Sequence, residues 1–126
     1  MIVLDTHVVL WWTSTPELLS EAAAEAIDSA AQLGIAAITF WEISMLVRKR
    51  RIALRLPVAG WMQQVLAIPR VRSIALTPSL AVAADQLNMH PDPADRFIVA
   101  SAKHHHATLI TKDALIQGLP FVDTIW

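Results

Sequence analysis

The chain has 126 residues, of which 55% are hydrophobic and 17% charged, and its formal net charge at pH 7 is −1. This composition excludes a disordered chain, and the length predicts a single domain spanning residues 1–126 with a substantial core. The near-neutral charge excludes a general electrostatic attraction to nucleic acid or membrane. The absence of cysteine excludes disulfides and a thiol nucleophile, and no apolar stretch reaches the roughly 18 residues of a membrane span. We therefore expect a cytoplasmic protein without a membrane partner.

Short apolar runs that predict buried strands alternate along the chain with segments that predict helices. In chain order, the expected strands span residues 2–5, 35–39, 73–76, 108–111 and 121–125. The expected helices span residues 7–12, 20–33, 40–50, 57–68, 77–88 and 94–106. Ser20 is the expected N-cap of the second helix, and Gly34 is its expected stop signal. This alternation predicts an α/β fold, a three-layer α/β/α sandwich with a mainly parallel sheet of about five strands.

Four acidic residues lie where a predicted strand ends or a helix begins: Asp5, Glu42, Asp95 and Asp113. Taken singly, each has a simpler interpretation as a helix cap, a turn residue or an acid in a first helical turn. Asp92 is the expected N-cap of the helix that carries Asp95, so its predicted role is supporting. Because parallel strands end at one edge of a sheet, we expect the four acids to converge there.

Converging carboxylates repel one another and raise each other's pKa unless a cation neutralises them. A set of oxygen ligands with no histidine or cysteine among them indicates Mg²⁺ or Mn²⁺ and argues against zinc. Such a site binds phosphate oxygens and activates water, so the reaction it favours is hydrolysis of a phosphodiester.

Four motifs occur in a fixed order over nearly the whole chain. They are Leu4-Asp5-Thr6-His7, Thr39-Phe40-Trp41-Glu42-Ile43, Asp92-Pro93-Ala94-Asp95-Arg96-Phe97-Ile98-Val99-Ala100 and Leu109-Ile110-Thr111-Lys112-Asp113. With these motifs the chain resembles the PIN-domain ribonucleases of the VapC type, the toxins of toxin–antitoxin pairs. The resemblance implies that the four acids surround Mg²⁺ or Mn²⁺, with Thr6 and Thr111 supporting them by hydrogen bonds. It also implies RNA as substrate, a VapB-like antitoxin as partner, and a homodimer. Ala94 stands where phenylalanine is frequent in such motifs, which is a difference in packing.

The only dense basic cluster includes Arg48, Lys49 and Arg51 at the end of a predicted helix. It is either a solvated helix end or a surface for RNA phosphates or for an acidic antitoxin segment. The adjacent Trp11 and Trp12 cannot both face one core, so one of them is expected at an interface.

Two other classes of function remain open from the residues. One is a phosphatase or phosphotransferase with Asp5 as nucleophile, although such enzymes commonly place a second aspartate two positions on, where this chain has His7. The other is a non-enzymatic α/β module that binds a partner. A receiver-like module would have paired acids near the first strand and a lysine after a late strand. Of these features only the lysine, Lys112, is suggestive.

Overall fold

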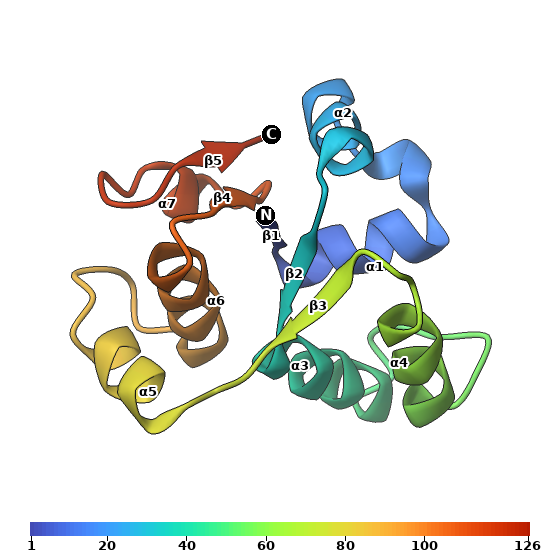
Figure 1. Ribbon diagram of the computed structural model, residues 1–126. Coiled ribbons are helices and arrows are strands. Elements are labelled where there is room, and N and C mark those ends of the chain that lie inside the picture. Colours follow the sequence, from blue (N-terminus) through green and yellow to red (C-terminus); the bar gives the residue numbers. More distant parts are fainter.

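The computed structural model describes residues 1–126 and contains one sheet with helices packed against both of its faces (Figure 1). The strands are β1 (Ile2–Leu4), β2 (Leu33–Ala36), β3 (Val71–Ile74), β4 (Thr108–Ile110) and β5 (Thr124–Ile125). Their order is β3-β2-β1-β4-β5, and each neighbouring pair is parallel. The predicted α/β class with a five-stranded, mainly parallel sheet is confirmed.

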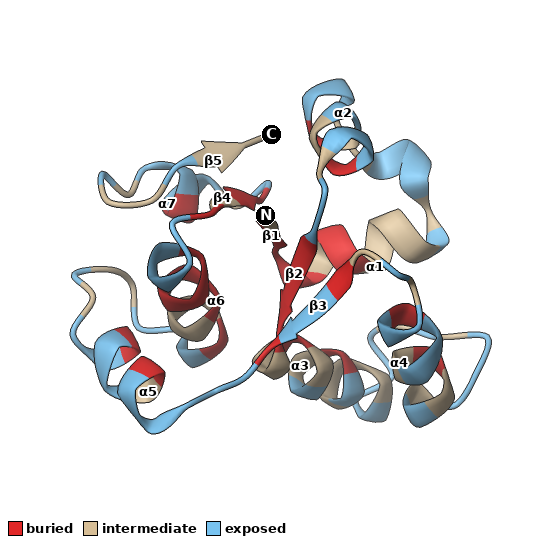
Figure 2. Ribbon diagram, viewed as in Figure 1, coloured by how far each residue is buried: buried red, intermediate tan, exposed pale blue.

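The helices form two groups that cover opposite faces of this sheet. They are α1 (Thr6–Ser14), the 3₁₀ helix η1 (Pro16–Leu18), α2 (Glu21–Ser29), α3 (Ala37–Arg48), α4 (Val58–Leu66), α5 (Pro78–Asp85), α6 (Pro93–His104) and α7 (Ala114–Gln117). Leu4 and Ile110 pack with apolar residues of α1 to α4, whereas Val3 and Leu109 pack with α6 and α7. Side chains that alternate along the strands thus contribute to two cores, and Figure 2 shows β2, β1 and β4, the central strands, as largely buried. None of the helices combines the length and the apolar character that crossing a membrane requires.

Several element boundaries differ from those predicted, most clearly around Gly34. Helix α2 ends at Ser29, and Gly34 lies inside β2 and not at a helix end. A Cβ atom on Gly34 would lie 2.8 Å from Cδ1 of Ile74 and 3.1 Å from Sδ of Met1, so a larger residue here would force the buried side chain of Ile74 to shift. Helix α7 was not expected, and β5 has two of the five residues assigned to the last strand.

The direction of the strands places several helix starts at the same edge of the sheet. Helices α1 and α3 follow β1 and β2 directly, so they begin at the carboxyl edge. Helix α6 also begins at this edge, because it precedes β4 and a helix that precedes a parallel strand runs back along the sheet. The loop that follows β4 starts there as well, so the fold brings the predicted acids to one place.

Candidate active site

Asp5 ends β1 with its carboxylate almost fully buried, at 3% exposure. One carboxylate oxygen, Oδ1, accepts a hydrogen bond from the backbone N–H of Thr6 (2.7 Å), so Asp5 caps α1. The other, Oδ2, accepts from the hydroxyl of Thr111 (2.6 Å), which lies just after the neighbouring strand β4. The ends of the two central strands therefore fix the carboxylate of Asp5 from both sides.

Thr111 connects Asp5 to Asp113. Its buried hydroxyl oxygen also accepts a hydrogen bond from the backbone N–H of Asp113 (3.0 Å). Asp113 in turn caps the short helix α7, because its Oδ1 accepts from the backbone N–H groups of Leu115 and Ile116. This position brings Asp113 to the same edge of the sheet as Asp5.

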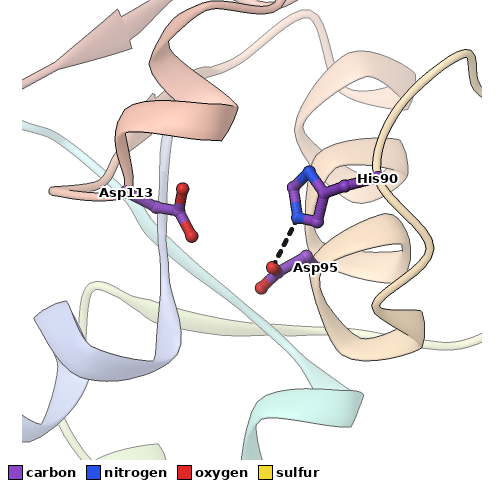
Figure 3. A group of neighbouring side chains, drawn as sticks. All are labelled: His90, Asp95 and Asp113. Atoms are coloured by element: carbon purple, nitrogen blue, oxygen red, sulfur yellow. Dashed lines mark hydrogen bonds and ion pairs between the residues drawn. The ribbon is translucent and has the colours of Figure 1, made fainter.

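Asp95 and Asp113 lie close to each other, and a histidine lies beside Asp95. Asp92 caps α6 by accepting from the backbone N–H of Asp95 (3.1 Å), as expected from its position. Oδ2 of Asp95 lies 2.7 Å from Nε2 of His90. His90, Asp95 and Asp113 each offer one ligand atom, and these atoms lie within 4.8 Å of one another (Figure 3). The structure thus places a histidine beside two of the predicted acids, and the sequence did not predict this neighbour.

His90 gave only a weak signal in the sequence. It lies in the loop between α5 and α6, five positions before Asp95, and it looked like a loop residue beside a proline. Its place in the cluster depends on the path of this loop, and neither periodicity nor capping predicts that path.

Glu42 lies in the second turn of α3, half-buried, and is electrostatically coupled to the other acids. Burial raises the pKa of its carboxyl group, and the charges of Asp95 and Asp5 raise it further, whereas a hydrogen bond with the Thr6 side chain lowers it. The hydroxyl of Thr6 also contacts the buried hydroxyl of Thr39 at 3.3 Å. Thr6 thus lies beside Glu42, in agreement with the supporting position expected for it.

Burial also raises the pKa of Asp95, and the hydrogen bond from His90 opposes this effect. The charges of Asp5, Asp92 and Asp113 add to the increase. The four predicted acids therefore share one field of negative charge. A divalent cation would relieve this repulsion, and carboxylate oxygens with one imidazole fit such an ion.

His7 is held beside the cluster by both of its ring nitrogens. Nε2 accepts a hydrogen bond from the backbone N–H of Lys112 (3.0 Å), and Nδ1 lies 3.5 Å from Oδ2 of Asp5. Burial lowers the pKa of His7, although the charge of Asp5 opposes this effect. A neutral His7 with both nitrogens directed at the chain itself fits a positioning role better than that of a proton shuttle.

The basic cluster lies outside the acidic cluster. Arg48 ends α3, Lys49 follows it, and both are exposed, as is Arg51. None of the three takes part in either of the ion pairs in the chain. Arg48 is six residues beyond Glu42, which corresponds to about 9 Å along the helix axis.

These features define an α/β protein with acidic side chains gathered at the carboxyl edge of a parallel sheet. A family model described as PIN domain matches residues 2–121. The chain is also 40% identical over 129 residues to Ribonuclease VapC22 from Mycobacterium tuberculosis (strain ATCC 25618 / H37Rv), covering 99% of this chain and 98% of that protein. The chain belongs to the PIN-domain family, and its relationship to VapC22 assigns it to the VapC proteins.

Solved structures share the fold at low sequence identity. VapBC2 from Rickettsia felis, bound to a DNA fragment from their promoter, matches with a TM-score of 0.73 and 16% identity, covering 99% of this chain and 98% of that one. A toxin–antitoxin complex from Klebsiella pneumoniae matches with a TM-score of 0.70 and 19% identity, covering 100% of this chain and 97% of that one.

Proposed function

We propose that this protein is a metal-dependent ribonuclease that hydrolyses RNA phosphodiesters as the toxin of a toxin–antitoxin pair. The observation that carries the proposal is the convergence of Asp5, Glu42, Asp95 and Asp113 at one edge of the sheet. Burial raises the pKa values of Glu42 and Asp95, and the negative charge of the neighbouring acids raises them further. The relative VapC22 is named a ribonuclease, which supports the same reaction.

In the proposed mechanism Asp5, Asp95 and Asp113 hold the cation, and Glu42 contributes a ligand or orients the attacking water. Mg²⁺ or Mn²⁺ bound here would stabilise charge on the phosphate and lower the pKa of water. The hydrogen bonds from Thr6 and Thr111 fix the carboxylate of Asp5, and each of its oxygens keeps a lone pair for ligation.

Glu42 is suited to accept the proton of the water, because its pKa is raised above its ordinary value. Hydrolysis forms a bond between the water oxygen and phosphorus. It breaks the bond between phosphorus and the leaving ribose oxygen, which takes up a proton.

The neighbourhood of Asp5 argues against an aspartyl-nucleophile phosphatase. Such enzymes commonly place an acidic aspartate two positions on, where this chain has His7, whose ring nitrogens are directed at Lys112 and Asp5. A non-enzymatic binding module would have no need for buried, mutually repelling acids, because they cost stability.

Removal of divalent cations tests the mechanism. We expect cleavage of single-stranded RNA to stop in the presence of a chelator and to return with Mg²⁺ or Mn²⁺. Ca²⁺ should not restore it, because this ion is larger and its coordination geometry is looser. Cleavage that persists after rigorous removal of metal would rule out the mechanism.

We further propose a VapB-like antitoxin as partner, a homodimer as the assembled form, and the cytoplasm as the place of action. A groove of about 400 Å³ beside α1 and α4, lined by Trp12, Trp61, Val65 and Ile68 among others, offers an apolar surface for such a partner. Trp11 instead packs near His7 and Trp126, so the two adjacent tryptophans face different surroundings. Co-purification with a VapB-like protein tests the partner. Sedimentation, compared with the 13.9 kDa of one chain, tests the dimer.

A further inference from the structure

His90 has the position of a metal ligand and not that of an ordinary loop residue. Its side chain is only 19% exposed, and Nε2 lies 2.7 Å from Oδ2 of Asp95. In Figure 3 the imidazole of His90 and the carboxylates of Asp95 and Asp113 surround a common space, although they come from a loop, the start of α6 and the start of α7.

The spacing of these atoms matches adjacent positions around a small cation. With metal–ligand bonds of about 2.1 Å, two neighbouring ligands of an octahedral ion are about 3 Å apart and two opposite ligands are about 4.2 Å apart. The separation of 2.7 Å between Nε2 of His90 and Oδ2 of Asp95 is that of a hydrogen bond between the two side chains, and it is also close to the first value. The upper limit of 4.8 Å for the whole group exceeds the second by about half an ångström, which small side-chain rotations can close.

Arg96 holds the loop that carries His90. Its guanidinium group donates hydrogen bonds to the backbone carbonyls of Ala84, Asp85, Leu87 and Met89. Met89 directly precedes His90, and its carbonyl oxygen lies 2.7 Å from Nη2 of Arg96. Arg96 follows Asp95 in the sequence, so α6 fixes both members of the His90–Asp95 pair. A ligand held in this way loses little freedom when an ion binds.

We propose that His90 binds the metal ion through Nε2 and thereby makes the site prefer Mn²⁺ over Mg²⁺. The inference rests on the proposed function, because it concerns the ion of the same site. Imidazole is a good ligand for first-row transition ions, whereas Mg²⁺ favours oxygen ligands. A set of carboxylates with one imidazole therefore favours Mn²⁺, which accepts both. Without the ion, Nε2 carries the proton that it donates to Asp95. Ligation requires the other tautomer, with the proton on Nδ1, so that the lone pair of Nε2 faces the ion.

The alternative role for His90 is to orient Asp95 by a hydrogen bond while the ion contacts only oxygen. The two roles differ in whether a nitrogen atom is bonded to the ion. Electron spin echo envelope modulation of the Mn²⁺-loaded protein detects such a nitrogen directly. We expect ¹⁴N coupling in the wild type, its loss in His90→Gln, and its retention in His7→Gln, which removes the other imidazole beside the acids.

Binding isotherms for the two ions give a second measurement. His90→Gln should weaken Mn²⁺ binding by about tenfold or more and Mg²⁺ binding by less than about threefold, so that the preference falls. Equal weakening for both ions would overturn the inference, as would ¹⁴N coupling that is absent from the wild type or persists in His90→Gln. If His90→Gln does not fold, the wild-type and His7→Gln spectra decide, because His90 is then the remaining imidazole at this edge.

RNA cleavage by the wild type separates this inference from the proposed function. Cleavage with Mn²⁺ but without nitrogen coupling would overturn the role of His90 alone. A protein that binds Mn²⁺ with nitrogen coupling but leaves RNA intact would keep the ligand and refute the ribonuclease.

Discussion

Asp5 shows how one side chain can serve both the fold and the site. Its Oδ1 caps α1 and its Oδ2 bonds to Thr111, so the carboxylate is structural before any ligand is present. Asp113 likewise caps a helix, α7, and also lies close to Asp95 in the acidic cluster. Capping and ligation looked like competing explanations in the sequence. They are compatible, because a carboxylate has two oxygens and several lone pairs.

Asp5→Asn should separate these two contributions. Asparagine keeps the cap on α1, but its amide NH₂ cannot accept the hydrogen bond that the Thr111 hydroxyl donates, so the free energy of unfolding should fall by about 1–3 kcal/mol. RNA cleavage should fall by about 100-fold or more, because loss of a ligand costs at least as much as loss of its hydrogen-bonding partner. Urea unfolding and an RNA cleavage assay measure the two effects.

Asp28→Asn is the matched control, because Asp28 is exposed at the end of α2 and distant in sequence from the site. This control should retain full activity. Wild-type cleavage by Asp5→Asn would show that Asp5 has no part in the reaction.

The raised pKa values of Glu42 and Asp95 predict how the stability of the metal-free protein varies with pH. Their ordinary values are 4.5 and 3.8, and the folded state holds both pKa values higher. Between the ordinary and raised values the folded state binds more protons than the unfolded state, so this contribution to stability grows as pH falls through that window. The lowered pKa of His7 acts in the opposite direction below pH 6.5.

Comparing the wild type with Asp95→Asn isolates the contribution of Asp95 to the pH dependence of stability. His7 is present in both proteins, so its own contribution largely cancels. Relative to this variant, the wild type should gain stability in a chelator as the pH falls from neutral toward the ordinary pKa of 3.8 of an aspartate. Urea unfolding at a series of pH values measures the difference. A difference that is constant with pH would contradict the proposed repulsion.

At the scale of the elements, periodicity and composition predicted every strand and most helices but not all of their ends. The boundary between β2 and α3 was misplaced because Ala36 is the N-cap of α3 without a capping side chain. Ile35-Ala36-Ala37-Ile38 is equally apolar on both sides of the boundary, so no local signal marks it. The position of His90 likewise depends on the contacts that Arg96 makes with a loop, which are tertiary interactions.

Gly34 was mistaken for a helix stop because the reason for glycine lies in neighbouring strands. We predict that Gly34→Ala costs about 1–3 kcal/mol, because the added methyl group would overlap the buried side chain of Ile74. Gly60→Ala is the matched control, since nothing lies within 4 Å of the new Cβ in α4. That change should stabilise the protein by about 0.5–1 kcal/mol. Equal effects of the two changes in urea unfolding would refute the packing argument.

At the scale of the whole molecule, a net charge of −1 hides an uneven distribution. Acids gather at the carboxyl edge of the sheet, and an exposed basic cluster follows α3. RNA attracted to the basic cluster would approach the acids from one side, within a few nucleotides of Glu42. Attraction by a few local bases also explains how a chain without overall positive charge could bind a polyanion.

Changing Arg48 and Arg51 to glutamine together should weaken RNA binding and flatten its dependence on salt. If each contacts one phosphate of a single strand, the slope of log K against log salt should fall by about 1.4. A double change of Arg72 and Lys103 to glutamine removes the same charge toward the opposite edge of the sheet, and it should leave the slope unchanged. If the wild type and both double variants have the same slope of log K against log salt, the basic cluster is a solvated helix end and does not contact RNA.

The hydrogen bond between Thr111 and Asp5 joins residues that are 106 positions apart, and it sets the time at which the site can exist. While the chain is being translated, Asp5 emerges first, but β4 and Asp113 emerge only after more than 100 further residues. A growing chain therefore holds an incomplete acidic cluster until Asp113 has been added. A ribonuclease built in this order lacks the hydrogen bond between Thr111 and Asp5, and the carboxylate of Asp113, for as long as the preceding residues are being added.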